Sequence, residues 1–139
     1  MILLDTNVVS EPLRPAPDNR VVAWFDAQAL ATLFLSAITV AELRAGVAQL
    51  PAGKRRTSLQ DSLETRVLPL FAGRVLPFDL ACTQAYATLM AKARASGLAI
   101  ASADGYIAAI AAANGLAVAT RDTRAFEAAG ATVINPWLS

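Results

Sequence analysis

The 139-residue sequence contains no histidine. That absence excludes histidine as a general acid or base, the Ser-His-Asp and Cys-His nucleophiles, and zinc sites built on imidazole. Hydrolytic chemistry in this chain would therefore depend on carboxylates and metal ions. The metals that carboxylate oxygens prefer are Mg²⁺ and Mn²⁺.

Cysteine and long apolar runs are also scarce. Cys82 is the only cysteine, which excludes a disulfide within the chain and fits a reducing cytoplasm. No apolar run reaches the roughly 18 residues of a membrane span. The residues before Asp5 lack the basic and then apolar pattern of a signal peptide. We therefore expect a cytoplasmic protein without a membrane segment.

Apolar residues, by contrast, are abundant. They make up 55% of the sequence, and the mean hydropathy is +0.45. Such values indicate a large core, a surface covered by a partner, or both. The length fits a single domain over residues 1–139, and no internal repeat or linker interrupts it. The net charge of +1 neither demands nor excludes nucleic acid.

Short apolar segments alternate with helical segments along the whole sequence. This alternation predicts an α/β fold with a mostly parallel sheet, right-handed crossovers and helices on both faces. Strands are expected at 2–4, 33–35, 75–78, 116–119 and 131–134. A helical turn is expected at 8–11, and helices at 18–29, 39–50, 57–68, 80–96, 107–113 and 123–128, with Asp18 and Asp79 as N-caps.

Four carboxylates follow a predicted strand or lie in the first turn of a predicted helix: Asp5, Glu42, Asp104 and Asp122. In an open α/β sheet these positions can share the edge where the strands end, which is where such folds bind ligands. Carboxylates gathered there repel one another unless a cation lies among them. A divalent metal would relieve that repulsion and could activate water for attack on a phosphodiester.

Each of these acids also has a purely structural interpretation. Asp5 and Asp122 could serve as N-caps of the helices that follow them. Thr39 and Glu42 match a capping box, in which Glu42 would only hold a backbone N–H. Asp104 could simply favour the helix dipole, a contribution of about 0.3–1 kcal/mol. Residue by residue, these alternatives stay open.

Motifs around the four acids resemble those of PIN-domain ribonuclease toxins of the VapC type, and most closely the FitB-like branch. The resemblance spans nearly the whole chain in family order, and no acidic position departs from the pattern. It rests on LDTNVVSEPLRP, LSAITVAELRAGV, VLPFD, ADGYIAA, VATRD and INPW.

The resemblance implies a PIN domain with a central parallel sheet of order 3-2-1-4-5 and helices on both faces. It implies RNA cleavage dependent on Mg²⁺ or Mn²⁺, with Asp5, Glu42, Asp104 and Asp122 as catalytic and metal-binding residues. Asp5 and Asp104 would be the most direct ligands, while Glu42 and Asp122 complete the pocket directly or through water. The supporting polar groups would be Thr6, Asn7 and Thr120.

The resemblance also implies partners. They are a second copy of the chain in a homodimer, an RNA substrate and a cognate antitoxin, with DNA bound only indirectly through that antitoxin. Specificity for RNA would depend on loops and on basic side chains. The candidates are the triplet Lys54, Arg55 and Arg56, which lies in a predicted loop, together with Arg44 and Arg121.

The sequence has two alternative functional interpretations. Phosphoryl transfer to an aspartate is disfavoured, because one such phosphatase pattern places a second Asp where this chain has Asn7. The other is a non-catalytic module whose acidic pocket serves only the antitoxin and its DNA complex. A nuclease assay on the free protein separates it from the enzyme.

Overall fold

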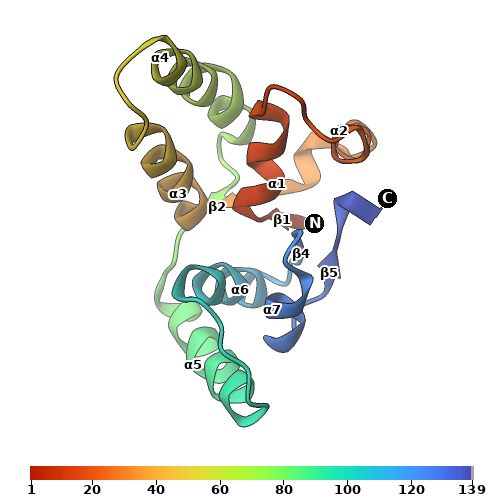
Figure 1. Ribbon diagram of the computed structural model, residues 1–139. Coiled ribbons are helices and arrows are strands. Elements are labelled where there is room, and N and C mark those ends of the chain that lie inside the picture. Colours follow the sequence, from red (N-terminus) through yellow and green to blue (C-terminus); the bar gives the residue numbers. More distant parts are fainter. Residues whose placement is uncertain (139) are drawn as a thin grey trace.

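Five short strands form one sheet in the computed structural model, which describes residues 1–138 (Figure 1). The sheet order is β3-β2-β1-β4-β5, and every adjacent pair of strands is parallel. The predicted α/β class and the strand order implied by the resemblance are both confirmed. The strands are β1 (Ile2–Leu4), β2 (Leu33–Ser36), β3 (Val75–Leu76), β4 (Ala117–Ala119) and β5 (Val133–Ile134).

Helices cover both faces of this sheet. Figure 1 shows α1 to α4 on one side and α5 to α7 on the other. The α-helices are α1 (Thr6–Ser10), α2 (Asn19–Asp26), α3 (Ala37–Ala48), α4 (Lys54–Asp61), α5 (Leu80–Ala95), α6 (Ser102–Asn114) and α7 (Thr123–Ala128). The 3-10 turns are η1 (Glu11–Leu13), η2 (Leu30–Thr32), η4 (Leu68–Phe71) and η5 (Pro136–Leu138), and η3 (Ser62–Val67) is π-helical. No helix within residues 1–138 is long and apolar enough to cross a membrane.

The core is divided into two layers by the sheet. Successive strand residues point to opposite faces, so Leu3 and Val118 pack with buried residues of α5, α6 and α7. Leu4 and Ala119 pack with buried residues of α1, α2 and α3. The uninterrupted apolar strand sequences follow from this, because a parallel sheet covered on both faces needs apolar residues at every position.

Several predicted helix ends are confirmed. Asp18 accepts a hydrogen bond from the N–H of Arg20 at 2.9 Å and is the N-cap of α2. Asp79 caps α5. Gly97 and Gly115 follow α5 and α6 with φ of 72° and 67°, a left-handed conformation that glycine adopts without strain.

Three predictions about helix starts are wrong, and one of them is that of α6, which begins at Ser102 rather than at Ile107. Helix α3 begins at Ala37 rather than Thr39, because Ser36 at the end of β2 accepts the N–H of Thr39 at 2.9 Å and is the N-cap. Helix α4 begins at Lys54, so the basic residues 54–56 form its first turn and not a loop. Strand β2 thus runs directly into α3.

The carboxyl ends of three neighbouring strands meet at one edge of the sheet. Asp5 follows β1, Ser36 ends β2 and Thr120 follows β4. Since β1 lies between β2 and β4, Asp5 stands at the centre of this edge, with a hydroxyl-bearing residue on each side.

Candidate active site

Asp5 is the buried centre of the site, with only 4% of its surface exposed. Its Oδ1 accepts the N–H of Thr6 at 2.8 Å, and its Oδ2 accepts the Thr120 hydroxyl at 2.7 Å and the Asn7 amide at 3.3 Å. The carboxylate is therefore both the N-cap of α1 and the group to which β4 is attached. Asp5 can therefore cap a helix and still be a candidate metal ligand.

Burial raises the pKa of Asp5 above its ordinary value, although its hydrogen bonds from Thr120 and Thr6 act in the opposite direction. The charges of Glu42 and Asp122 raise this pKa further. Two carboxylates from distant parts of the sequence are thus close enough to Asp5 to act on its charge.

Glu42 lies in the second turn of α3 and its carboxylate reaches α1. Its Oε1 accepts the Thr6 hydroxyl at 2.6 Å. The capping-box interpretation of Glu42 is wrong, because the N-cap of α3 is Ser36 and Thr39 is three residues inside the helix. The Glu42 carboxylate therefore does not hold a backbone N–H at the start of α3, and it lies at the edge of the site instead.

The loop after β4 joins the site from the other side. The Thr120 hydroxyl, which donates to Asp5, accepts the N–H of Asp122 at 3.0 Å. The N–H of Arg121 donates to Asn7 Oδ1 at 3.3 Å. Asp122 occupies the N-cap position of α7, but its side chain makes no capping hydrogen bond within residues 1–138. The N-cap role considered for the Asp122 carboxylate is therefore not realised.

Asp104 lies in the first turn of α6, as predicted. Partial burial, followed by the charges of Asp5, Asp122 and Glu42, raises its pKa to about 6. All three other predicted acids therefore act on Asp104. Asp104 is thus within electrostatic range of the three other acids that the sequence predicts for this edge of the sheet.

The donor groups fit a hard divalent cation. Every predicted ligand is a carboxylate oxygen, and burial and like charges penalise ionisation, a cost that a cation would relieve. Within residues 1–138, however, no three acidic or cysteine side chains already stand at the spacing of a metal site.

Two buried hydroxyl residues adjoin the site but are not among the predicted site residues, namely Ser36 and Thr39. Both are fully buried, and the Thr39 hydroxyl lies 3.2 Å from the hydroxyls of Ser36 and Thr6. The position of Ser36 at the end of a predicted strand was a usable signal. The sequence predicts Thr39 only as part of a capping box.

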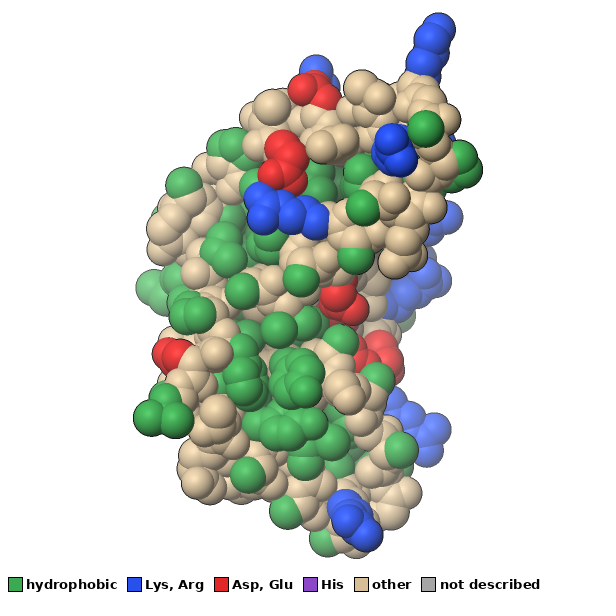
Figure 2. Space-filling view, turned by 90° about the vertical axis from the view of Figure 1, so that its left-hand side faces the viewer, with side chains coloured by type: hydrophobic (Ala, Val, Ile, Leu, Met, Phe, Trp, Pro, Cys, Tyr) green, Lys and Arg blue, Asp and Glu red, His purple; other side chains and the backbone are tan. Residues whose placement is uncertain are grey.

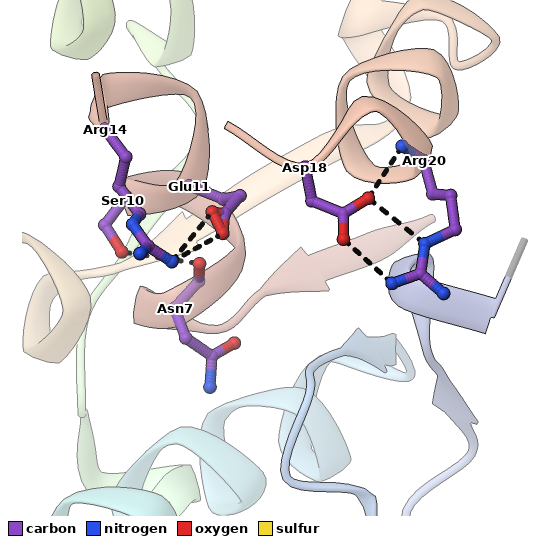
Figure 3. Close-up of polar contacts among 6 residues, drawn as sticks. All are labelled: Asn7, Ser10, Glu11, Arg14, Asp18 and Arg20. Atoms are coloured by element: carbon purple, nitrogen blue, oxygen red, sulfur yellow. Dashed lines mark hydrogen bonds and ion pairs between the residues drawn. The ribbon is translucent and has the colours of Figure 1, made fainter. Parts of the chain in front are cut away.

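An ion pair braces the segment after α1. Glu11 is 3% exposed, and Arg14 Nη1 lies 3.0 Å from its Oε1. Figure 3 shows that the Asn7 side chain points away from this pair, while Asp18 and Arg20 form a second pair nearby. This ion pair lies within residues 11–14 and does not use the Asn7 amide, which instead hydrogen-bonds to Asp5 and to the N–H of Arg121.

A parallel sheet of this order, with carboxylates at the ends of its central strands, defines the class of the protein. The chain matches the PIN domain family over residues 2–131 and belongs to that family.

Individual relatives agree along nearly the full length. The chain is 64% identical over 137 residues to a protein of Sinorhizobium fredii named VapC ribonuclease Y4jK, covering 99% of this chain and 98% of the relative. It is 58% identical to Toxin FitB of Neisseria gonorrhoeae, with 99% of each covered. Its structure matches the crystal structure of FitAcB from Neisseria gonorrhoeae with a TM-score of 0.95 at 58% identity, covering 99% of both chains.

Proposed function

We propose that this chain is the toxin of a toxin–antitoxin pair and that it hydrolyses RNA phosphodiester bonds in the cytoplasm, using Mg²⁺ or Mn²⁺ at the Asp5 site. The observation that carries the proposal is the buried Asp5 carboxylate, which is held by three donors and whose charge interacts with those of Glu42, Asp122 and Asp104. The relative named VapC ribonuclease Y4jK supports the activity, and the relative named Toxin FitB supports the role as a toxin.

Each residue has a distinct part in this proposal. Asp5 and Asp104 would be the most direct metal ligands, with Glu42 and Asp122 binding directly or through water. When bound, a divalent ion supplies an activated water and stabilises the charge that develops on the phosphate. Thr6, Asn7 and Thr120 hold the carboxylates in place through the hydrogen bonds described above.

The antitoxin would lie in a groove that starts at Glu42. The groove has a volume of about 730 Å³ and is lined by Thr6, Glu42, Arg14, Arg55 and a row of apolar side chains from η1, α3 and α4. An amphipathic segment fits such a lining, with its apolar side on the leucines and a basic side chain directed at Glu42. DNA would be bound by the antitoxin and not by this chain.

A second copy of the chain would cover apolar surface on the α5 and α6 side. Figure 2 shows a broad hydrophobic area in the lower half of the molecule, the half in which Figure 1 shows α5 and α6. Leu80, the first residue of α5, is 86% exposed, and Phe78 and Tyr86 are only partly buried. Sedimentation of the free chain should give a dimer of two 14.5 kDa chains.

Substitution of Asp5 by Asn tests the activity. The protein is produced with its antitoxin, separated from it, and incubated with RNA and Mn²⁺. Asp5→Asn keeps the shape of the side chain but removes the buried charge, so RNA cleavage should fall by roughly 100-fold or more. Growth arrest on expression of the free toxin should disappear as well.

Asp26→Asn is the matched control, because Asp26 is an exposed aspartate at the end of α2. It should cleave RNA as the unmodified chain does. Full cleavage by folded Asp5→Asn would contradict the proposed site. Failure of the unmodified, antitoxin-free chain to cut any RNA would instead favour the non-catalytic binding module.

A further inference from the structure

Three hydroxyl groups lead from the interior of the fold to the Glu42 carboxylate. The Ser36 and Thr39 hydroxyls are 3.2 Å apart, those of Thr39 and Thr6 are also 3.2 Å apart, and the Thr6 hydroxyl is 2.6 Å from Glu42 Oε1. We call Ser36, Thr39 and Thr6 the hydroxyl series. It connects the end of β2, the first turn of α3 and the start of α1.

Each hydroxyl has a single proton to donate, and this determines the direction of these hydrogen bonds. An ionised carboxylate can only accept, so Thr6 must donate its single proton to Glu42. The Thr6 oxygen can then only accept from Thr39, and the Thr39 oxygen can only accept from Ser36. The Ser36 oxygen in turn accepts the backbone N–H of Thr39 at 2.9 Å. Every hydroxyl therefore donates once and accepts once.

The two ends of the hydroxyl series differ in freedom. Ser36 and Thr39 are fully buried, whereas Glu42 lies on an exposed part of α3. An exposed glutamate otherwise samples many rotamers, so a donor fixed by the core limits where its carboxylate can be. Because Oε1 is engaged by Thr6, Oε2 is the oxygen left for a cation or for its bound water.

We propose that Thr39 is a positioning residue, which acts through Thr6 to hold the Glu42 carboxylate in the orientation that binds the metal. The inference rests on the proposed function for its biological meaning, but its central measurement is metal binding and does not require RNA cleavage. Thr39 touches neither the substrate nor the cation in this proposal.

The test compares Thr39→Val with Thr39→Ser. Valine keeps the shape of threonine but has no hydroxyl, so Mn²⁺ binding measured by calorimetry should weaken roughly tenfold, the effect typical of partners that orient metal ligands. Serine restores the hydroxyl and should bind Mn²⁺ within about twofold of the unmodified chain. The control is Thr32→Val, since the Thr32 hydroxyl donates to the Ala29 carbonyl away from the site.

A cycle with Glu42→Gln separates positioning from general damage. If Thr39 acts only through Glu42, then Thr39→Val should change Mn²⁺ affinity less than about twofold once Glu42→Gln is present. An undiminished tenfold loss in that background would overturn the inference, as would unchanged binding by folded Thr39→Val. If Thr39→Val does not fold, Thr6→Val replaces it, since it removes the final donor to Glu42.

Failure of the proposed function is distinguishable in the same experiment. A chain that binds Mn²⁺ with the expected dependence on Thr39 but cuts no RNA would leave the positioning role intact and contradict the nuclease. A chain that cuts RNA but shows no dependence on Thr39 would contradict only the positioning role.

Discussion

Asp104 is a carboxylate of the site on which partial burial acts first and the charges of the other three acids act next. Its pKa is about 6 in the fold, against an ordinary value of 3.8. Ionising this carboxyl therefore costs more in the folded than in the unfolded chain. The ionisation of Asp104 therefore lowers the free energy of unfolding as the pH rises from about 4 to about 6, and the full loss is present above pH 6.

Removing the charge of Asp104 should therefore stabilise the metal-free protein at neutral pH. Asp104→Asn is expected to raise the free energy of unfolding by about 1 kcal/mol at pH 7.5, a value discounted for the partial exposure of the side chain. That corresponds to roughly 3–5 °C in melting temperature. The advantage should shrink toward pH 4, where Asp104 is protonated in the fold and about half ionised in the unfolded chain.

Thermal melts of both proteins in EDTA between pH 4 and pH 8 measure this difference. Comparing the two proteins at each pH cancels other carboxylates, such as Asp18, whose pKa is lowered to about 2 by Arg20. A difference that stays constant across this pH range would contradict the prediction.

At the residue scale, the acids were predictable and most of their hydrogen bonds were not. Asp5 and Asp122 follow strands and Asp104 opens a helix, and these positions can be read from apolar segments and their ends. That Asp5 binds Thr120, which is 115 residues away, depends on β1 and β4 lying side by side. Local sequence pattern carries no information about such a pairing.

At the level of elements, α5 and α6 pack closely because Gly105 has no side chain. A Cβ at this position would lie 3.1 Å from Tyr86 Cε2 and 3.3 Å from Met90 Sδ. Tyr86 cannot easily move away, since its ring stacks on Tyr106 with centroids 4.9 Å apart and contacts the edge of Phe78.

Gly105→Ala should therefore destabilise the fold by about 1 kcal/mol, because the crowding of a tightly packed ring outweighs the better helix propensity of alanine. Gly46→Ala in α3 is the matched control. Nothing lies within 4 Å of a Cβ at Gly46, so this substitution should stabilise by roughly 0.5–1 kcal/mol. Urea denaturation of both variants gives the two values, and an equal effect of both would contradict the packing argument.

Elements with strong local signals were predicted well. Helix α7 has the predicted bounds of 123–128, and α5 begins after its predicted cap. The start of α3 was missed because Ser36 and Thr39 are both good capping residues, and the choice between them depends on where β2 ends. The start of α4 was missed because residues 54–56 are charged and give no apolar periodicity.

For the whole molecule, the alternation of strands and helices was enough to predict a parallel sheet but not its order. Right-handed crossovers permit several orders for five strands. The order 3-2-1-4-5 was implied only by the resemblance of the motifs, and the structure confirms it. This order makes β1 the central strand, which places Asp5 between the ends of β2 and β4.

A divalent cation should stabilise the entire fold, because it would bind carboxylates that meet only in the native state. Saturation at about 100 times the dissociation constant adds roughly 2.7 kcal/mol to the free energy of unfolding. Mn²⁺ should therefore raise the melting temperature by several degrees at pH 7.5. The increase should shrink below pH 6, where protons compete for Asp104.

Two comparisons decide whether this stabilisation belongs to the site. Asp5→Asn should lose most of the Mn²⁺-induced increase, while Asp26→Asn should keep it, because both substitutions remove one negative charge but only Asp5 is buried at the sheet edge. Sodium chloride of matched ionic strength controls for screening. An equal increase in both variants would mean that Mn²⁺ binds elsewhere on the surface, and the four acids would then need no cation to coexist.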